Sequence, residues 1–225
     1  MILVDKFSDI VASMRATGDI TVNTPSGTNT ICTSVNTLTA GEVISMDSVD
    51  YIVITASATQ FTVSGTVTAS TWTALAPYYE YGHPQEIADI LTGKDGHATK
   101  KYQKYPLIVF YTDVRIKHGN PTFYGELERQ FISIIGQSVE GYSSKQRYDN
   151  VITPILIPLH TSLINKIKSS RYFLGVSPEL DYTEVRRPFW GSTSKYGNIK
   201  NMFNDHLDAI DMENIKLKLR EGNTC

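Results

Sequence analysis

The stretch SSKQRYDNVITPILIPLHTSLINKIKSSRY, residues 143–172, decides the fold of this chain. Ser143 and Gln146 have the spacing of a capping box, which marks a helix start. Apolar residues then recur every three to four positions, the stripe of an amphipathic helix. We therefore predict a helix near 145–170, with a buried stripe that comprises Tyr148, Ile152, Ile155, Leu159, Leu163 and Ile167.

Two prolines, Pro154 and Pro158, lie inside this predicted helix. Each removes a backbone donor and crowds the carbonyl four residues earlier, which costs about 3 kcal/mol in a regular helix interior. We expect the helix to be kinked or broken there and to be held in place by packing.

Apolar stretches on both sides of the helix predict strands near 106–114, 125–137 and 208–219. A second amphipathic helix is expected over 3–16. Because the last strand alternates apolar and charged residues, we place it at or near a sheet edge. The predicted fold class is α+β, with a mostly antiparallel sheet flanked by helices.

Residues 19–75 differ sharply in composition from the rest. Threonine supplies 15 of the 57 residues from Thr17 to Thr73, in short alternating runs separated by turn residues. Such runs predict an antiparallel β-module, either a small barrel or a sandwich. We interpret 19–75 as an insertion into a host domain formed by 1–18 and 76–225. An independent N-terminal β-domain that carries a helix is the alternative.

The chain has 225 residues, of which 41% are hydrophobic, which is enough for a packed core. Its two cysteines provide no disulfide framework. The first residues lack the pattern of a signal peptide, and no apolar run is long enough to span a bilayer, so no membrane partner is expected.

The formal net charge is −2, but the charges are unevenly distributed. Residues 16–93 contain seven acids and no lysine or arginine, whereas residues 94–225 contain 19 basic and 14 acidic side chains. This division suits a molecule that stacks on copies of itself or on differently charged partners. It is also what a threonine-rich segment that happens to lack lysine would show.

No catalytic signature is found: no phosphate-binding loop, nucleophile elbow or zinc-protease motif occurs. His83 and Glu86 at a predicted helix start supply too few ligands for a metal, and a capping or packing role is preferred for His83. Asp113, Glu126 and Glu128 lack the lysine that metal-dependent nucleases place after the second acid. We therefore expect no enzyme, no metal and no cofactor.

Residues 173–206 are predicted to be a long irregular segment, and such segments are often functional. Within it, RRPFWG at 186–191 leaves three interpretations open. Arg186, Arg187, Phe189 and Trp190 could grip phosphates and bases, or dock into a neighbouring subunit. Alternatively, Trp190 packs inward in an ordinary structural loop.

Several strings in joint order resemble a known family. PYYEYGHPQEI, KKYQKYPLIVF, RYDNVITPILIPLHTSLINKI, RPFWG and NDHLDAIDMENIKLKL are similar to strings in tail-terminator or neck proteins of tailed bacteriophages, and most resemble those of phages of gut Bacteroidales. The resemblance covers 1–18 and 76–225. None of these strings is a catalytic signature, so it is their order that carries the resemblance.

The resemblance implies a structural virion protein, assembled in the bacterial host cytoplasm, that forms a homo-oligomeric ring between portal and tail. The implied partners are itself as a hexamer or dodecamer, portal or adaptor and tail proteins, and genomic DNA that passes through the lumen without sequence specificity. The basic loop with Lys94, Lys100, Lys101 and Lys104 is a candidate lumen lining, and Arg186, Arg187, Phe189 and Trp190 are candidate interface residues. The alternative is a virion-surface binding module whose β-insertion recognises a host glycan or another virion protein.

Overall fold

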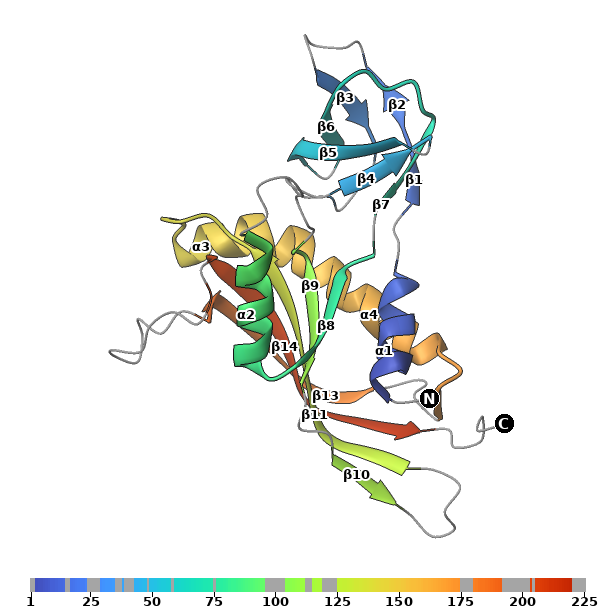
Figure 1. Cartoon of the computed structure of the whole chain (residues 1–225), viewed down its shortest axis with the longest axis vertical. Coiled ribbons are helices and arrows are strands. Elements are labelled where there is room, and N and C mark those ends of the chain that lie inside the picture. The colour runs from blue at the N-terminus through green and yellow to red at the C-terminus, as the bar shows by residue number, and fades with distance from the viewer. Residues whose placement is uncertain are drawn as a thin grey trace. The chain divides into compact units, whose positions relative to one another are not determined.

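The chain forms two compact units of mixed α and β structure (Figure 1). Unit 1 comprises Met1–Ser13 and Tyr78–Cys225, and unit 2 comprises Met14–Pro77. The break in composition along the sequence predicts the boundaries between these units at residues 18/19 and 75/76. The computed structural model describes residues 3–14, 17–23, 29–34, 38, 43–47, 49–57, 59–74, 76–95, 104–111, 115–118, 125–174, 180–191, 203 and 205–219.

Unit 1 is built on one sheet with the strand order β12-β14-β11-β9-β8, in which β13 also pairs with β14 and β10 with β11. Every pairing is antiparallel except that of β8 with β9. The three strands predicted in this unit are confirmed as β9, β11 and β14. The bounds are β8 Tyr78–Gly82, β9 Leu107–Tyr111, β10 Arg115–His118, β11 Gly125–Gln137, β12 Phe173–Leu174, β13 Asp181–Trp190 and β14 Leu207–Leu219.

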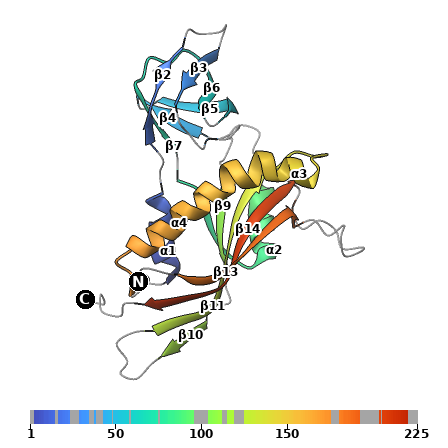
Figure 2. The same ribbon diagram turned by 180° about the vertical axis from the view of Figure 1, so that it is seen from behind.

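Helices cover both faces of this sheet (Figures 1 and 2). Leu107 and Val109 of β9 belong to the cluster under α2 (Pro84–Asp95). Their neighbour Phe110 lies on the opposite face, where its ring centroid is 4.5 Å from that of Phe7 in α1 (Leu3–Ala12). Alternate residues of β9 thus pack into the apolar layers on the two faces of the sheet. This explains why the sequence of β9 is apolar without interruption.

The first helix ends earlier than the predicted 3–16. Ser13 leaves the helix at its end, and its hydroxyl donates to Ile10 O at 2.7 Å, a local bond that competes with helix continuation. Gly18 lies in strand β1 (Thr17–Asp19). A Cβ at Gly18 would approach Trp72 Nε1 to 2.7 Å, so close packing against the indole accounts for this glycine.

The helix predicted near 145–170 is confirmed, and so is its capping box. Ser143 accepts from Gln146 N, and the Gln146 side chain accepts from Ser143 N. The helix runs continuously through α3 (Ser144–Arg147), the π-helix η1 (Tyr148–Leu156) and α4 (Ile157–Ser169). Pro154 lies inside η1, where the wider hydrogen-bond spacing replaces the expected break.

The π-helical turns also move the buried stripe. Ile152, Leu163 and Ile167 are buried as predicted, but Leu156 and His160 are buried where Ile155 and Leu159 were expected. The inward face is advanced by one residue at the end of the π-helix and in the turn after it, because a π-helix has more residues per turn than an α-helix, and the predicted positions are regained at Leu163. Sequence periodicity assumes one constant turn and therefore misplaces this part of the stripe.

β14 lies near the sheet edge, as predicted, with β11 on one side and the edge strands β12 and β13 on the other. It is not half-exposed, because some of its charged residues are buried and paired within the protein. The prediction that residues 181–190 are irregular is wrong, since they form β13. Residues 78–82, for which no strand was predicted, form β8.

Unit 2 is an antiparallel sheet with the strand order β1-β7-β4-β5-β6-β3-β2. Its two edge strands are consecutive parts of the segment 17–22, whose Ile20 N donates to Ser70 O at 2.8 Å. The sheet therefore closes on itself as a small barrel. The bounds are β1 Thr17–Asp19, β2 Thr21–Val22, β3 Asn29–Thr33, β4 Val43–Met46, β5 Val49–Ala56, β6 Gln60–Ser64 and β7 Thr71–Ala74.

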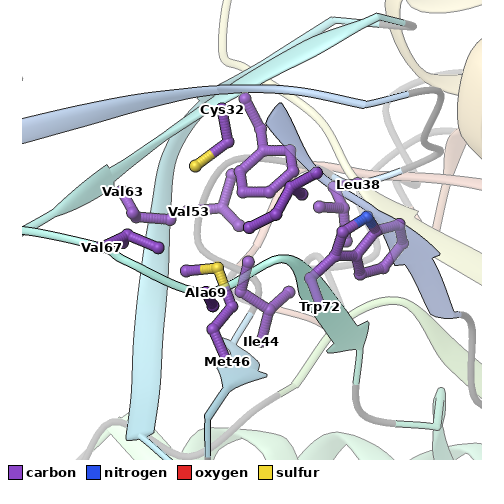
Figure 3. Packing of buried hydrophobic residues seen from close by; sticks show 11 residues of the cluster. Cys32, Leu38, Ile44, Met46, Val53, Val63, Val67, Ala69 and Trp72 are labelled. Carbon is purple, nitrogen blue, oxygen red and sulfur yellow. The ribbon is translucent and has the colours of Figure 1, made fainter. Parts of the chain in front are cut away.

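The barrel interior is filled by apolar side chains from most of its strands (Figure 3). Trp72 is the largest labelled member, and its Nε1 donates to Ser34 Oγ at 2.9 Å. Ser34 Oγ in turn donates to Asp19 O at 2.7 Å. Cys32 is free and buried, and burial raises the pKa of its thiol.

Candidate interaction surface

Strand β13 carries the four candidate interface residues and is the most exposed long strand of the sheet. None of its ten residues is buried, and its pairing with β14 is interrupted by irregularities between Asp181 and Thr183 and between Arg187 and Trp190. A loop was predicted here because the sequence has no alternation and contains Pro188. A strand edge tolerates both features, since an edge needs neither a buried face nor an outward N–H.

Arg187 is tied to the sheet by two carboxylates. Its Nε donates to Asp211 Oδ2 at 2.5 Å, and an Nη donates to Glu213 Oε1 at 2.7 Å. Asp211 is fully buried, and it also accepts from Ser133 Oγ at 2.5 Å. Burial raises the pKa of Asp211, against the opposing effect of Ser133 and Arg187. Arg187 is therefore engaged within its own chain.

Phe189 is the exposed aromatic residue of this region, at 42% relative exposure. Its backbone has a φ of 60°, a conformation that is uncommon for a bulky residue and costs about 1–3 kcal/mol. Two contacts hold it there. Phe189 N donates to Asp208 Oδ1 at 2.9 Å, and the Arg147 guanidinium carbon lies 4.0 Å from the ring centroid.

Arg147 is itself buried and fully committed. Its Nη1 donates to Asp208 Oδ1 at 2.8 Å, and its other nitrogens reach Tyr142 O at 3.2 Å and Val139 O at 3.5 Å. Val139, which provides one of those carbonyls, exposes 53% of its surface. We call Val139 and Phe189 the end patch: two exposed apolar residues, of which Val139 bonds Arg147 through its backbone carbonyl and Phe189 places its ring against Arg147.

Arg186 lies on the same face of the sheet as α4. Its Nε donates to Glu184 Oε1 at 2.6 Å, and Glu184 Oε2 lies 3.8 Å from Nδ1 of the buried His160. Burial lowers the pKa of His160, while Glu184 acts in the opposite direction. Arg186 exposes 43% of its side chain, so it can still meet a partner.

Trp190 packs inward. Its ring lies 5.0 Å from that of Phe203, and both contact the cluster beneath α2. Gly191 has a φ of 71°, and a Cβ there would come within 2.7 Å of the Phe203 ring. Trp190 therefore fits the interpretation in which it packs inward. Phe189 is exposed and is the aromatic side chain of RRPFWG that a partner can reach.

The structure places two of the four candidate lumen lysines, Lys94 and Lys104. Lys94 lies in the last turn of α2 with its Nζ 3.0 Å from the Tyr78 ring centroid. Burial lowers the pKa of Lys94, and the charge of Lys104 acts in the same direction. Lys104 is mostly buried in an ion pair with Asp205 at 2.9 Å. Lys100 and Lys101 lie outside the described residues.

The other candidates for chemistry are not brought together. His83 Nδ1 accepts from Gln85 N at 3.3 Å, which is a capping contact at the start of α2. Glu126 and Glu128 lie opposite Lys117 and Arg115 in the β10–β11 pairing, and Asp113 lies outside the described residues. Among the residues that the structure describes, no group of three or more metal-ligating side chains occurs.

The buried charges that organise this surface were not found from the sequence. Arg147 stands at the start of an amphipathic helix, and Asp208 and Asp211 occupy an alternating strand, so each resembles a solvent-facing residue. Within the described ranges, no helix is long and apolar enough to cross a membrane. Comparison with protein-family models, curated proteins and solved structures finds no match to this chain.

Proposed function

We propose that this chain is a structural virion protein of a tailed bacteriophage, which closes into a homo-oligomeric ring at the neck between portal and tail. In this proposal unit 1 has the tail-terminator plan, and DNA passes through the lumen of a hexameric or dodecameric ring. The joint order of the strings quoted above supports the neck location. The α+β architecture, with an antiparallel sheet between helices, is compatible with that plan.

The observation that carries the proposal of assembly is the end patch. Phe189 is exposed, strained and at the same time fixed by a buried arginine and a buried carboxylate. Fixing an exposed aromatic in advance reduces the entropy that a partner must overcome on binding. Aromatic residues of this kind dominate the binding energy of protein interfaces. A strained surface residue that is held so firmly is best explained by a contact.

A role around DNA is compatible with the charge. DNA has to slide through a neck lumen, so the lining needs to attract phosphate only weakly. The net charge of −2 meets that requirement. Two of the four candidate lining lysines, Lys94 and Lys104, are occupied by contacts within the chain.

Imaging of intact particles tests the proposal directly. We expect density for this chain as a closed ring between portal and tail. Density on the capsid surface or at fibre tips, or absence of the chain from particles, would overturn it. Phe189→Ala should reduce incorporation into particles, and the matched variant Val49→Ala in unit 2 should not.

An alternative from another class has one specific observation in its favour. Val49 and Ile54 of β5 are 51% and 40% exposed on unit 2. Exposed apolar side chains on a small barrel suit a module that binds another virion protein, or the apolar face of a host glycan. The test is the Ile54→Asp variant. If particles that carry it have an intact neck but no longer attach to the host, this alternative is favoured.

A further inference from the structure

In the part of the chain that the structure describes, four strands of unit 1 pair with a single neighbour: β8, β10, β12 and β13, of which β13 and β8 are the longest. β13 pairs only with β14, and β8 pairs only with β9. Tyr78 N donates to Pro106 O at 2.9 Å, so Tyr78 points its backbone groups towards β9. Because these groups alternate along a strand, the N–H and C=O of Tyr79 and Tyr81 point away from the sheet.

The two edges run in opposite directions. β13 is antiparallel to β14, β14 to β11 and β11 to β9, while β9 and β8 are parallel. β13 therefore runs opposite to β8. A second copy placed beside the first in the same orientation brings its β13 against β8 as an antiparallel pair, the geometry in which strands join most readily.

The regular lengths of the two edges are equal. β8 has five residues, Tyr78–Gly82. The part of β13 that pairs with β14 in unbroken register runs from Thr183 to Arg187, also five residues. Pro188 and the irregularity that follows it end this part. Full overlap places Tyr81 opposite Glu184 and Tyr79 opposite Arg186.

The hydrogen-bonding groups agree with this register. Pro188 has no N–H, and within a sheet proline is confined to positions where the missing donor faces outward. By alternation, Glu184 and Arg186 also point their backbone groups outward. In an antiparallel pair, residues that exchange both bonds must face each other. In this register, the outward backbone N–H and C=O groups of Tyr79 face those of Arg186, and those of Tyr81 face those of Glu184.

The side chains also fall on one face. Tyr81 packs towards Phe110, with 6.1 Å between ring centroids, on the sheet face that carries α1. Glu184 and Arg186 lie beside His160 of α4, on that same face (Figure 2). Tyr81 is 37% exposed, so its hydroxyl can meet Glu184 of the next copy and its ring can stack with Arg186.

We propose that copies of this chain join head to tail by pairing β13 of one copy with β8 of the next, so that the sheet continues from subunit to subunit. This inference rests on the proposed ring and specifies its contact. The contact uses two different edges and is therefore heterologous, the type that closes into rings by rotation. The occupant of each open edge is a second copy of this chain.

The first test uses the full-length protein and a matched pair of variants. Tyr81→Pro removes one outward N–H, whereas Tyr81→Ala removes the side chain and keeps the N–H. In sedimentation experiments, we expect Tyr81→Pro to raise the dissociation constant of assembly at least about tenfold more than Tyr81→Ala does, at an equal melting temperature. Equal assembly of the two folded variants would overturn the proposal.

Mixing two blocked variants tests the head-to-tail arrangement. Tyr81→Pro blocks β8, and Glu184→Pro blocks β13. Each alone should be monomeric, and the mixture should form a one-to-one dimer that grows no further, because only one pair of intact edges remains. Dimers of either variant alone, a mixture that stays monomeric, or a wild-type protein that never assembles would contradict the inference.

Amide hydrogen exchange of the wild-type protein covers the case in which a proline variant fails to fold. Residues 79–81 and 184–186 should gain protection together when the protein is concentrated from monomer to assembly. Assembly without protection at both edges overturns the inference. The proposed function and the proposed contact can fail separately. If the chain forms rings that depend on the two edges but are absent from the phage neck, the proposed function is wrong and the contact stands. If the neck contains rings that incorporate the Tyr81→Pro variant normally, the contact is wrong and the function stands.

Discussion

The two units use polar residues in opposite ways inside their cores. The buried polar side chains described in the barrel are the hydroxyls of Thr30 and Ser34, and both donate to backbone carbonyls. Unit 1 instead buries charged, amide and imidazole groups within and around its sheet. They are Gln130, Arg147, His160, Asp208 and Asp211, and the hydroxyls of Ser133 and Ser138 are buried in the same unit.

The difference shows what each core achieves. The two hydroxyls are satisfied by backbone carbonyls, and Ser34 also accepts from Trp72, so the rest of the barrel interior is free for apolar packing. Buried charges are costly and need several partners, but they can hold a neighbouring surface residue in a defined place. In unit 1 the Arg147–Asp208 pair holds Phe189, and Asp211 holds Arg187. One buried network, around Asp211, thus reaches the candidate surface at Arg187, and another, around Arg147 and Asp208, reaches it at Phe189.

The largest expected effect comes from breaking that network. Arg147→Met leaves Asp208 buried and unpaired, and should lower the free energy of unfolding of unit 1 by about 3–5 kcal/mol. Trp72→Phe, which removes the bond to Ser34 and part of the indole that packs on Gly18 in unit 2, should cost about 2 kcal/mol. Calorimetry of the full chain measures both, because each variant should shift a different transition.

A double variant sharpens this expectation. Arg147→Met combined with Asp208→Leu removes both charges and should recover most of the lost stability, while Phe189 loses its support. If Arg147→Met costs no more than Trp72→Phe, the contrast between the two cores is wrong.

A smaller effect separates the two aromatic residues of the candidate surface. Trp190 is half-buried against Phe203, so Trp190→Ala should lower the stability of unit 1 by about 2 kcal/mol. Phe189→Ala should leave the melting temperature nearly unchanged and weaken assembly. Thermal melts and sedimentation on the same samples give both quantities. A destabilised Phe189→Ala that assembles normally would show that Phe189 is a structural residue.

The smallest effect is a dependence on pH that only unit 1 should show. Burial lowers the pKa of His160 from its ordinary value of 6.5, so the folded state resists protonation. The stability from neutral His160 is therefore complete above pH 6.5 and is lost as the pH falls below it. Denaturant titrations at several pH values should show a shallower acid loss for His160→Leu than for the wild type. Equal slopes would exclude His160 as the titrating group.

Much of the framework followed from local chemistry. The capping box at Ser143 and the unbroken apolar run of β9 are local signals, and both are confirmed. The Thr-rich segment was recognised as β structure because its short alternating runs need no distant partner to be identified.

The rest depends on distant contacts. Asp208 and Asp211 look solvent-facing along the chain, because their partners Arg147 and Arg187 are 61 and 24 residues away. β13 has no buried face, so no periodicity marks it as a strand. The one-residue advance of the long helix follows from π-helical turns around Pro154, which period analysis cannot represent.

The pairing of β1 with β7 has a consequence for folding. Thr17 lies opposite Thr73, so the segments entering and leaving the barrel run side by side, about 5 Å apart. Until the barrel forms, α1 must find β8 and β9 across a long flexible loop, with the corresponding entropy of closure. Once the barrel has formed, that loop is short. Unit 2 is thus expected to speed the folding of unit 1 by lowering its effective contact order.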